Sequence, residues 1–374
     1  MSFSSIVSSV YHGLIQNLYG KPKALIDLFR HNDCFLAEGY YPELGTGSKR
    51  NALLYQIKQV LKYGFRDDYY YMYGLDVKSK AEQKEYLHYV PFQIRRDNLN
   101  YKNNAHNSTC ILRNKLYFDV VAHSLGLTTP KILAYTSRRS LYVFSEGAFK
   151  KANVEELLCF DGNRLFCKEI EGECGMGIFV LEIRDNHFFV GGKSIPSQVL
   201  EDKLIESDYL LQEIVTQHPA MSALYDGSIN TMRLVTVRGL KDEKVHVMPS
   251  MLRIGANGSY VDNTSQGGIA VGFDTNTGQL HEWGFFKPQF GRKVNSHPNS
   301  GIVFKDFYIP NIEKAREDAI RFHEFLTDVH SIGWDIAMGP NGPVFIEGND
   351  NWEINGPQVG NHGLRKEFEE YFYK

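Results

Sequence analysis

Two carboxylates and an amide near the carboxyl-terminal end of the chain have the residue types and spacing of a metal site. Asp335 lies in the segment GWDIAM, and Glu347 and Asn349 lie two residues apart in VFIEGN. The Gly-Pro-Asn-Gly sequence at 339–342 predicts a turn between two antiparallel strands. Residues two apart on a strand point to the same face, and the paired strand brings Asp335 beside them. These oxygen groups, without histidine or cysteine, suit Mg²⁺. A solvated hairpin with ordinary polar residues has the same pattern.

A second group of residues suits a polyphosphate. Lys168 ends the predicted strand RLFCKEI, and a glycine-rich segment with Gly172, Gly175 and Gly177 follows it. An ammonium group attracts phosphate oxygens, and glycines let backbone amides approach them. A plain glycine-rich β-turn would look similar. Lys115, on a helix predicted over 108–124, supplies a second cation upstream.

The apolar strand YLLQEIV, residues 209–215, could hold a nucleotide base. It ends in Gln212, Glu213 and Ile214. The edge of such a strand can give backbone hydrogen bonds to an adenine, while isoleucine and valine side chains form a wall beside the base.

Two arginines on predicted strands are candidates for contact with a carboxylate or phosphate. Arg233 lies in NTMRLVTVR and Arg253 in MLRIG, and the planar guanidinium binds such groups through two hydrogen bonds. The polar loop that contains Asn263, within 261–272, is a candidate cradle for an oxyanion. The bland alternatives are surface arginines on strands and a simple hairpin connection.

The elements that must position these residues form an α+β pattern. Residues 1 to about 105 are predicted to be mostly helical, and strands dominate from about 130 onward. The longest helical pattern runs over 309–332. No GxGxxG motif follows an early strand, so the pattern is not that of a Rossmann domain.

Composition excludes several classes of protein. The chain has 374 residues, 43% hydrophobic and 23% charged, with a net charge of −3, which describes a soluble protein without the basic field that nucleic acid requires. No run of 18 apolar residues predicts a membrane span. The first 23 residues are expected to form an amphipathic helix and not a signal peptide. Five cysteines without metal spacing are typical of reduced thiols in a cytoplasmic protein.

Taken in order, these motifs resemble the ATP-grasp superfamily over residues 108–355. The order is a lysine in NKLYFDVVAHSLGLTTPKILAY, a second lysine before a glycine-rich hairpin, the strand QEIV, an arginine strand and an Asp…Glu-x-Asn hairpin. The segments NTMRLVTVR, VDNTSQGGIAVGFD and GWDIAMGPNGPVFIEGN are most similar to the sugar-transfer-associated branch, which is linked to polysaccharide biosynthesis.

The resemblance implies an α+β ATP-grasp fold in which two α+β sub-domains clasp ATP, after a mostly helical amino-terminal region. The expected parts are the helical region 1–107, an amino-terminal lobe with the glycine-rich loop over 108–211, and a carboxyl-terminal lobe with the metal hairpin over 212–374. The implied cofactors are ATP and Mg²⁺. The implied contacts are Lys115 and Lys168 with phosphates, the glycine-rich loop 172–177 above them, Gln212 and Ile214 with adenine, and Asp335, Glu347 and Asn349 with Mg²⁺.

The sequence departs from the family pattern at three places. Asn114 stands where an aspartate often precedes the first lysine. Gly333 stands where many carboxylate ligases have an arginine two residues before the first metal aspartate, so Arg233, Arg253 or another group must supply that charge. His218 and Pro219 stand where an acidic partner for the ribose is expected.

The resemblance implies a ligase that forms an amide from a carboxylate and an amine through an acyl phosphate, with release of ADP and phosphate, in polysaccharide or secondary-metabolite synthesis. One alternative is a small-molecule kinase that phosphorylates a hydroxyl, with Asp262 or His297 as base. Another is a nucleotide-binding protein without catalysis. The aromatic segment 69–75 is expected to pack on the core or to form a homodimer face.

Overall fold

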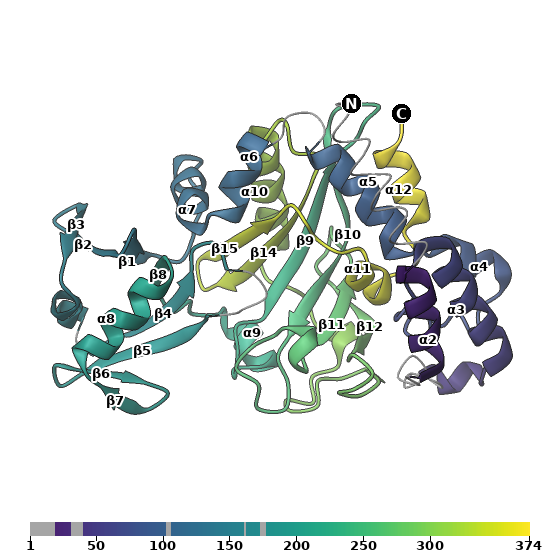
Figure 1. Ribbon diagram of the computed structural model, residues 1–374, viewed down its shortest axis with the longest axis horizontal. Helices are drawn as coiled ribbons and strands as arrows, with labels where there is room; N and C mark the ends of the chain where they lie inside the picture. Colours follow the sequence, from purple (N-terminus) through teal and green to yellow (C-terminus); the bar gives the residue numbers. More distant parts are fainter. Residues whose placement is uncertain (1–18, 31–39, 102–105, 161, 173–176) are drawn as a thin grey trace.

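The computed structural model describes residues 19–30, 40–101, 106–160, 162–172 and 177–374. Two antiparallel sheets organise the chain (Figure 1). The eight-stranded sheet forms a smaller lobe at one end of the molecule. The seven-stranded sheet, with longer strands, forms the centre of a larger lobe, and the amino-terminal helices lie at the opposite end (Figure 1). This arrangement confirms the predicted α+β class. The amphipathic helix expected over residues 1–23 lies largely outside the described residues.

The first sheet has eight strands in the order β3-β2-β1-β8-β4-β5-β6-β7. Their bounds are β1 Ile132–Ser137, β2 Ser140–Ser145, β3 Ala148–Ala152, β4 Arg164–Glu169, β5 Phe179–Arg184, β6 His187–Val190, β7 Lys193–Ile195 and β8 Tyr209–Glu213. On β4, Leu165 and Cys167 are buried in the lobe's own hydrophobic core, which α8 (Ser197–Glu206) covers. Because side chains alternate along a strand, Lys168 points to the opposite face of this sheet.

The second sheet has seven strands in the order β13-β12-β11-β10-β9-β14-β15. Their bounds are β9 Thr231–Arg238, β10 Val245–Ile254, β11 Ile269–Phe273, β12 Leu280–Phe285, β13 Lys293–Val294, β14 Ser331–Gly339 and β15 Gly342–Asn349. The predicted hairpin is present: β14 and β15 pair from Gly333 and Asn349 to Gly339 and Gly342 at the turn.

Strand β14 is buried along its whole length, and its two faces differ in chemistry. Trp334 stacks on Phe322 of α10 (Ile312–Phe325), with ring centroids 4.9 Å apart, and meets Phe345 of β15 edge-on. The next residue, Asp335, therefore points to the other face. The apolar face anchors the strand on α10, and the polar face is left for the candidate site.

The helix predicted over 309–332 is shorter in the structure. Helix α10 ends at Phe325, and Ile332 already belongs to β14. Leu326 and Val329 continue the apolar spacing because the chain turns back into the core, where both are buried. Apolar spacing reports burial, and here it continues past the point where the helix ends.

The helix predicted over 108–124 is divided in two by Asn114. Helix α6 (His106–Arg113) ends before it, and α7 (Lys115–Ser124) begins after it. The Asn114 side chain accepts hydrogen bonds from the amides of Leu116 and Tyr117, each at 3.1 Å. This is the contact by which asparagine or aspartate caps a helix, so asparagine can replace the aspartate of the family pattern here.

The remaining helices lie around the two sheets, and η4 (Val154–Phe160) among them packs in the core of the smaller lobe. They are α2 Lys21–Arg30, η3 Pro42–Leu44, α3 Lys49–Tyr63, α4 Lys80–Glu85, α5 Tyr89–Tyr101, η4 Val154–Phe160, α9 Pro219–Leu224, η5 Thr264–Gln266, η6 Phe304–Asp306, α11 Asn355–Gly360 and α12 Arg365–Phe372. Within the described residues, none is long and apolar enough to cross a bilayer.

The aromatic segment 69–75 forms turns and not a helix. Tyr70 to Tyr73 and Leu75 are buried in a cluster with Phe285 and Val359 of the larger lobe. The Tyr73 hydroxyl donates to Asn355 Oδ1 at 2.9 Å. The segment therefore packs on the core of its own chain and is not free to form a homodimer face. The homodimer itself stays a prediction.

The domain boundaries expected at 107/108 and 211/212 also stay predictions. Strand β8 continues through residues 211 and 212, and Gln212 and Glu213 pair with Phe166 and Leu165 of β4. The chain leaves the first sheet after Glu213, two residues later than the boundary drawn from sequence.

A buried aspartate in the amino-terminal region makes stability depend on pH. The Asp67 carboxylate accepts from the Tyr55 hydroxyl at 2.9 Å and from the amide of Tyr69 at 3.1 Å. Burial nevertheless raises the pKa of Asp67 to about 6. Between about pH 4 and pH 6 the folded protein then holds a proton that the unfolded chain has lost, so the free energy of unfolding falls as pH rises through this window.

We therefore expect Asp67→Asn to gain stability relative to the unmodified protein as pH rises from about 4 to about 7, by roughly 1–3 kcal/mol. The asparagine oxygen can accept from the Tyr69 amide, its NH2 group can donate to the Tyr55 hydroxyl, and the side chain carries no charge. Thermal unfolding of both proteins at several pH values measures the difference, in which the other titrating groups cancel. A difference that is constant over this range would contradict the assignment.

Candidate active site

The three predicted metal-binding residues lie together on the β14–β15 hairpin. Asp335 stands directly opposite Glu347, and Gly333 stands opposite Asn349. The Asn349 side-chain amide donates to Glu347 Oε1 and to the Gly333 carbonyl, each at 3.3 Å. A register shift follows Asp335, where the ladder passes from the 335–347 pair to the 336–345 pair. The polar face of the hairpin thus gathers two carboxylates and one amide.

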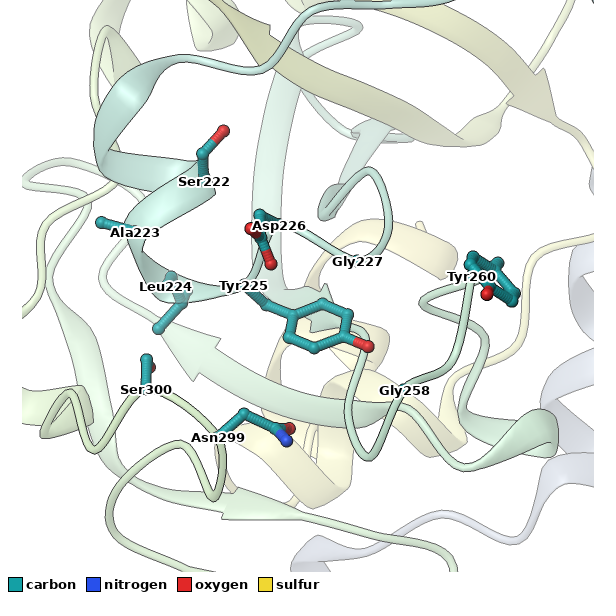
Figure 2. A pocket seen from close by; sticks show the side chains of 10 residues that line it. All are labelled: Ser222, Ala223, Leu224, Tyr225, Asp226, Gly227, Gly258, Tyr260, Asn299 and Ser300. Carbon is teal, nitrogen blue, oxygen red and sulfur yellow. The ribbon is translucent and has the colours of Figure 1, made fainter.

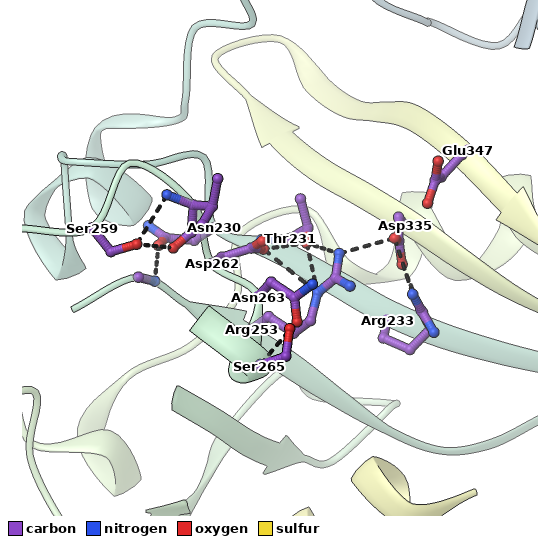
Figure 3. A network of polar contacts seen from close by, with 12 residues as sticks. Asn230, Thr231, Arg233, Arg253, Ser259, Asp262, Asn263, Ser265, Asp335 and Glu347 are labelled. Carbon is purple, nitrogen blue, oxygen red and sulfur yellow. Dashed lines mark hydrogen bonds and ion pairs between the residues drawn. The ribbon is translucent and has the colours of Figure 1, made fainter. Parts of the chain in front are cut away.

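Asp335 is held between two arginines from neighbouring strands (Figure 3). Arg233 of β9 donates to its two oxygens at 2.5 and 3.1 Å, and Arg253 of β10 donates to Oδ2 at 2.9 Å. Burial alone would raise the pKa of Asp335, but the two guanidiniums outweigh burial and hold that pKa well below its usual range. The carboxylate is therefore charged and compensated inside the protein.

The position of Arg233 explains the glycine at 333. A Cβ on Gly333 would lie 2.7 Å from Trp352 Cβ and 3.1 Å from Arg233 Cδ. No side chain fits between these two residues, so an arginine at 333 has no room. Arg233 comes from the adjacent strand, crosses this space and reaches the aspartate two residues along. The Arg233 guanidinium thus supplies a positive charge next to Asp335, although residue 333 itself is a glycine.

Thr231 and Asp262 extend the network beyond Arg253. The Thr231 hydroxyl accepts from Arg253 Nη2 at 2.6 Å and donates to Asp262 Oδ2, which also accepts the Thr231 amide at 2.9 Å. Arg253 Nε lies 3.6 Å from the same oxygen. Burial raises the pKa of Asp262, while Arg253 and Thr231 lower it in part. Sequence reasoning considered Asp262 only as a base for a kinase and did not single out Thr231, since no local pattern marks this pair.

Asn263 lies beside this network but makes its hydrogen bonds within its own loop. Its side chain accepts from the amide of Ser265 at 3.0 Å, and its carbonyl accepts from the amide of Gly268 at 3.1 Å. It caps the short helix η5. Its predicted role toward an oxyanion stays a prediction.

Both predicted lysines face the hairpin from the side of the smaller lobe. Lys115 Nζ donates to the Gly172 carbonyl at 2.6 Å and lies 4.0 Å from Glu347 Oε2. Lys168 is buried, and within the described part of the chain its ammonium has no hydrogen bond or ion pair. Burial lowers the pKa of Lys168 to about 8, although the nearby carboxylates, Glu347 foremost, raise it. An uncompensated buried ammonium is ready to bind an anion.

Of the three predicted loop glycines, Gly172 and Gly177 are described, and Gly175 lies outside the described residues. Gly177 has a φ of +71°, and a Cβ there would lie 2.7 Å from Glu169 Oε1. Only glycine fits that position without strain. The Gly172 carbonyl is the acceptor for Lys115, so the loop and the lysine are joined.

The predicted adenine segment is partly engaged within the chain. The Gln212 side-chain amide donates to the Pro130 carbonyl at 3.0 Å, and the Glu213 backbone amide donates to the Lys131 carbonyl at 2.9 Å. Ile214 is 37% exposed. The Gln212 side chain thus supports the neighbouring connection, and Ile214 offers apolar surface to solvent.

Two hollows adjoin the far end of the network. The larger, about 480 Å³, lies between α9 with the following Tyr225–Gly227 segment, the turn at Gly258–Tyr260, and Asn299–Ser300 (Figure 2). Its lining carries hydroxyl, amide and carboxylate groups, and none of its lining residues is lysine or arginine. The Tyr225 hydroxyl donates to the Ser259 carbonyl at 2.8 Å, which ties its wall to the loop that carries Asp262. A second hollow of about 340 Å³ lies on the other side of Gly258.

The donor set on the hairpin fits a magnesium ion bound with a phosphate. Among the described residues, no three histidine, cysteine or acidic side chains are grouped so that they could hold a metal ion by themselves. Mg²⁺ needs only one or two carboxylates when phosphate and water complete its shell. Asp335 and Glu347 supply these, and lysines lie on the side where a phosphate would bind.

Comparison with known proteins places this chain in the ATP-grasp class. Residues 94–371 match the profile of the family described as sugar-transfer associated ATP-grasp. The chain belongs to that family, as the order of its motifs predicted. No curated protein sequence matches the chain.

Solved structures with a related fold are distant in sequence. N5-carboxyaminoimidazole ribonucleotide synthetase in complex with ADP has a TM-score of 0.40 at 11% identity, over 70% of this chain and 52% of that chain. L-amino acid ligase from Bacillus licheniformis has 0.37 at 10%, over 70% and 48%. D-alanine–D-alanine ligase from Helicobacter pylori has 0.37 at 12%, over 70% and 58%. This chain thus spans about half the length of these proteins, and so low a similarity carries no information on its substrates.

The pKa of Lys168 leads to a prediction for nucleotide binding. Its ammonium faces Lys115, Asp119, Glu347 and Asp335. Above about pH 8 the free protein loses the proton, so binding of a phosphate there must take up a proton. We expect the affinity for ADP with Mg²⁺ to fall as pH rises from about 8 to about 9.5, measured by titration calorimetry.

The matched variants are Lys168→Arg, which stays charged over this range, and Lys168→Ala, which has no charge. Arginine should weaken the pH dependence, and alanine should bind ADP more weakly at pH 7 with little dependence on pH. If all three proteins lose affinity in parallel above pH 8, Lys168 does not bind the phosphate.

Proposed function

We propose that this protein is an ATP- and Mg²⁺-dependent ligase that joins a carboxylate to an amine and releases ADP and phosphate. The observation that supports it most is the meeting of the two sheets at the hairpin. There the oxygen donors of Asp335, Glu347 and Asn349 face the ammonium groups of Lys115 and Lys168. Oxygen donors on one side and cations on the other suit a polyphosphate with its metal.

The proposed reaction has two steps. A carboxylate oxygen of the acid attacks the γ-phosphorus of ATP, and the bond from that phosphorus to the β–γ bridging oxygen breaks, so ADP leaves. The amine first gives up the proton of its ammonium form to solvent. Its nitrogen then attacks the acyl carbon, the bond from that carbon to the phosphate oxygen breaks, and the nitrogen loses a second proton to the released phosphate or to solvent. The products are the amide, ADP and phosphate. No side chain needs to form a covalent bond.

The chain's own residues would act by position and charge. Asp335, Glu347 and Asn349 would hold a Mg²⁺ ion together with ATP, and that ion would supply positive charge to the phosphates. Lys168 and Lys115 hold the phosphates from the opposite side. Because Asp335 then shares its charge with the metal, Arg233 and Arg253 can turn part of their hydrogen bonding toward the acid and the transferring phosphoryl group.

The hollow beside α9 suits the amine. Its lining has the carboxylate of Asp226 and the rings of Tyr225 and Tyr260, and Tyr260 is 89% exposed. A carboxylate and aromatic rings attract a positively charged amine, and no cation in the lining repels it. The loop from Ser259 to Asp262 leads from this hollow to Arg253.

A hydroxyl-phosphorylating kinase is the second candidate, and Asp262 is the residue that favours it. Its raised pKa and its place beside Arg253 suit a base near an acceptor hydroxyl. His297, the other base considered from sequence, is buried and binds the Gly255 carbonyl through Nε2 at 2.8 Å. It therefore belongs to the packing of the loop.

Product analysis tests the proposal. The protein is incubated with ATP, Mg²⁺ and mixtures of acids and amines, and ADP and free phosphate are measured separately. Equal release of ADP and phosphate that depends on both an acid and an amine is expected. ADP without free phosphate would identify a kinase, and neither product would indicate a nucleotide-binding protein without catalysis.

Glu347→Gln gives the matching variant. An amide offers only a neutral oxygen where Mg²⁺ with ATP needs charge, so we expect loss of turnover, by about a hundredfold or more. The side chain is partly exposed, and the fold should persist, as thermal unfolding will report. Turnover near that of the unmodified protein would remove Glu347 from the site.

The arginine pair gives a further prediction. Arg233→Lys keeps a charge but loses the fork that holds both oxygens of Asp335. We expect kcat to fall about tenfold or more while the Kd for ADP changes less than about threefold, because the lost contact matters most during transfer. Arg253→Lys, with one bond to Asp335, should change the KM of the acid more than kcat. Single-turnover rates and ADP binding decide between them, and a wild-type rate for Arg233→Lys would make Arg233 a structural residue.

A further inference from the structure

An ion pair with a buried carboxylate joins Arg113, the last residue of α6, to Asp350, which directly follows β15. Arg113 donates from Nε to both oxygens of Asp350 at 3.1 and 3.2 Å and from Nη2 to Oδ2 at 2.8 Å. The Tyr101 hydroxyl donates to the same Oδ2 at 2.8 Å. The Asp350 side chain is 3% exposed. A buried carboxylate with this many donors has one defined position.

Each partner of the ion pair is adjacent in sequence to a residue of the candidate site. Asp350 follows Asn349 of the metal hairpin. Arg113 precedes Asn114, which caps α7 and so fixes the direction in which Lys115 leaves the chain. Lys115 in turn contacts the glycine-rich loop. The ion pair is therefore a noncovalent link between the chain segment that carries Lys115 and the end of the metal hairpin.

The amino-terminal helical region also contacts the backbone of Asp350. Asn100 of α5 is fully buried, and its amide nitrogen donates to the Asp350 carbonyl at 2.8 Å and to the Ser331 carbonyl at 3.2 Å. Its side-chain oxygen accepts from the amides of His330 and Ser331, each at 3.1 Å. One side chain thus joins the start of β14 to the residue that follows β15.

We propose that Arg113 and Asp350 are positioning residues that set the distance between the Lys115 ammonium and the oxygens of Glu347 and Asn349, so that metal and phosphate bind together. This inference rests on the proposed function, since it needs a metal and a phosphate at those groups. The ion pair adds a contact of defined direction to the apolar packing of Leu112 and Phe118 in the core of the larger lobe. A shift of about 1 Å at such a site is enough to cost as much as a hundredfold.

The coupling between Mg²⁺ and nucleotide measures this positioning. In the unmodified protein, Mg²⁺ should strengthen ADP binding, because the metal contacts both the hairpin and the phosphates. In Asp350→Asn, ADP should still bind through the lysines without metal, while the strengthening by Mg²⁺ should shrink about 10- to 100-fold, the usual effect of losing a partner behind a metal ligand. Titration calorimetry with ADP, with and without Mg²⁺, gives both values.

A second buried carboxylate, with two half-exposed cationic partners, serves as control. Asp318 of α10 is 5% exposed and accepts from Lys314 at 2.7 and 2.8 Å and from Arg321 at 2.9 Å, away from the hairpin's polar face. Asp318→Asn should lower the melting temperature as Asp350→Asn does but leave the effect of Mg²⁺ on ADP binding unchanged. If lost stability were the cause, both variants would show the same change in the effect of Mg²⁺ on ADP binding. A change in Asp350→Asn alone indicates a positioning role.

Arg113→Lys keeps the test decisive where Asp350→Asn does not fold, because it keeps the charge, replaces a half-exposed side chain and loses only the fork. It should reduce the effect of Mg²⁺ by about tenfold. If the unmodified protein binds ADP without any effect of Mg²⁺, the proposed function fails and this inference with it. If the unmodified protein shows the effect and Arg113→Lys or Asp350→Asn retains it in full, the inference alone is overturned.

Discussion

The candidate site depends on the charge of Asp335, which is buried and balanced by two arginines. A carboxylate in such a place is strongly unfavourable without partners, and it becomes tolerable only when hydrogen-bonded cations surround it. Arg233 and Arg253 come from β9 and β10, and Asp335 comes from β14. A one-residue slip between these strands would turn Asp335 away from both arginines. The same contact thus fixes the order of charges in the site and the register of the central sheet.

This arrangement needs a strand that is rigid on one face and polar on the other. Strand β14 meets the requirement because Trp334 anchors it on Phe322 of α10 while Asp335 projects the other way. The smaller lobe contributes the opposite partner through Lys168, which points away from the core of its own sheet. Lys168 of the smaller lobe therefore faces the carboxylates of Glu347 and Asp335 on the larger one, and an anion with a bound cation matches both.

Local signals in the sequence predicted the parts of the site that one segment defines. The hairpin with Asp335 and Glu347, the strands of Arg233 and Arg253, and the strand that carries Lys168 all follow from alternation and glycine placement. Pairings between distant segments were not predictable in this way. Thr231 with Asp262 and Arg113 with Asp350 depend on how sheets and helices assemble, and no spacing in the chain marks them. The predicted length of the helix at α10 was wrong for a related reason. Leu326 and Val329 are apolar because they are buried, although they lie beyond the end of the helix.

The crossing of Arg233 over Gly333 affects how this chain should be compared with its relatives. Column by column, an alignment would record a missing arginine at 333 and an unrelated one a hundred residues earlier. In three dimensions a guanidinium from the neighbouring strand lies against the aspartate, and the bare glycine leaves room for the side chain that carries it. A comparison of functional residues position by position would score this chain as lacking the arginine. A comparison of the charged groups around the aspartate in three dimensions would find a guanidinium there.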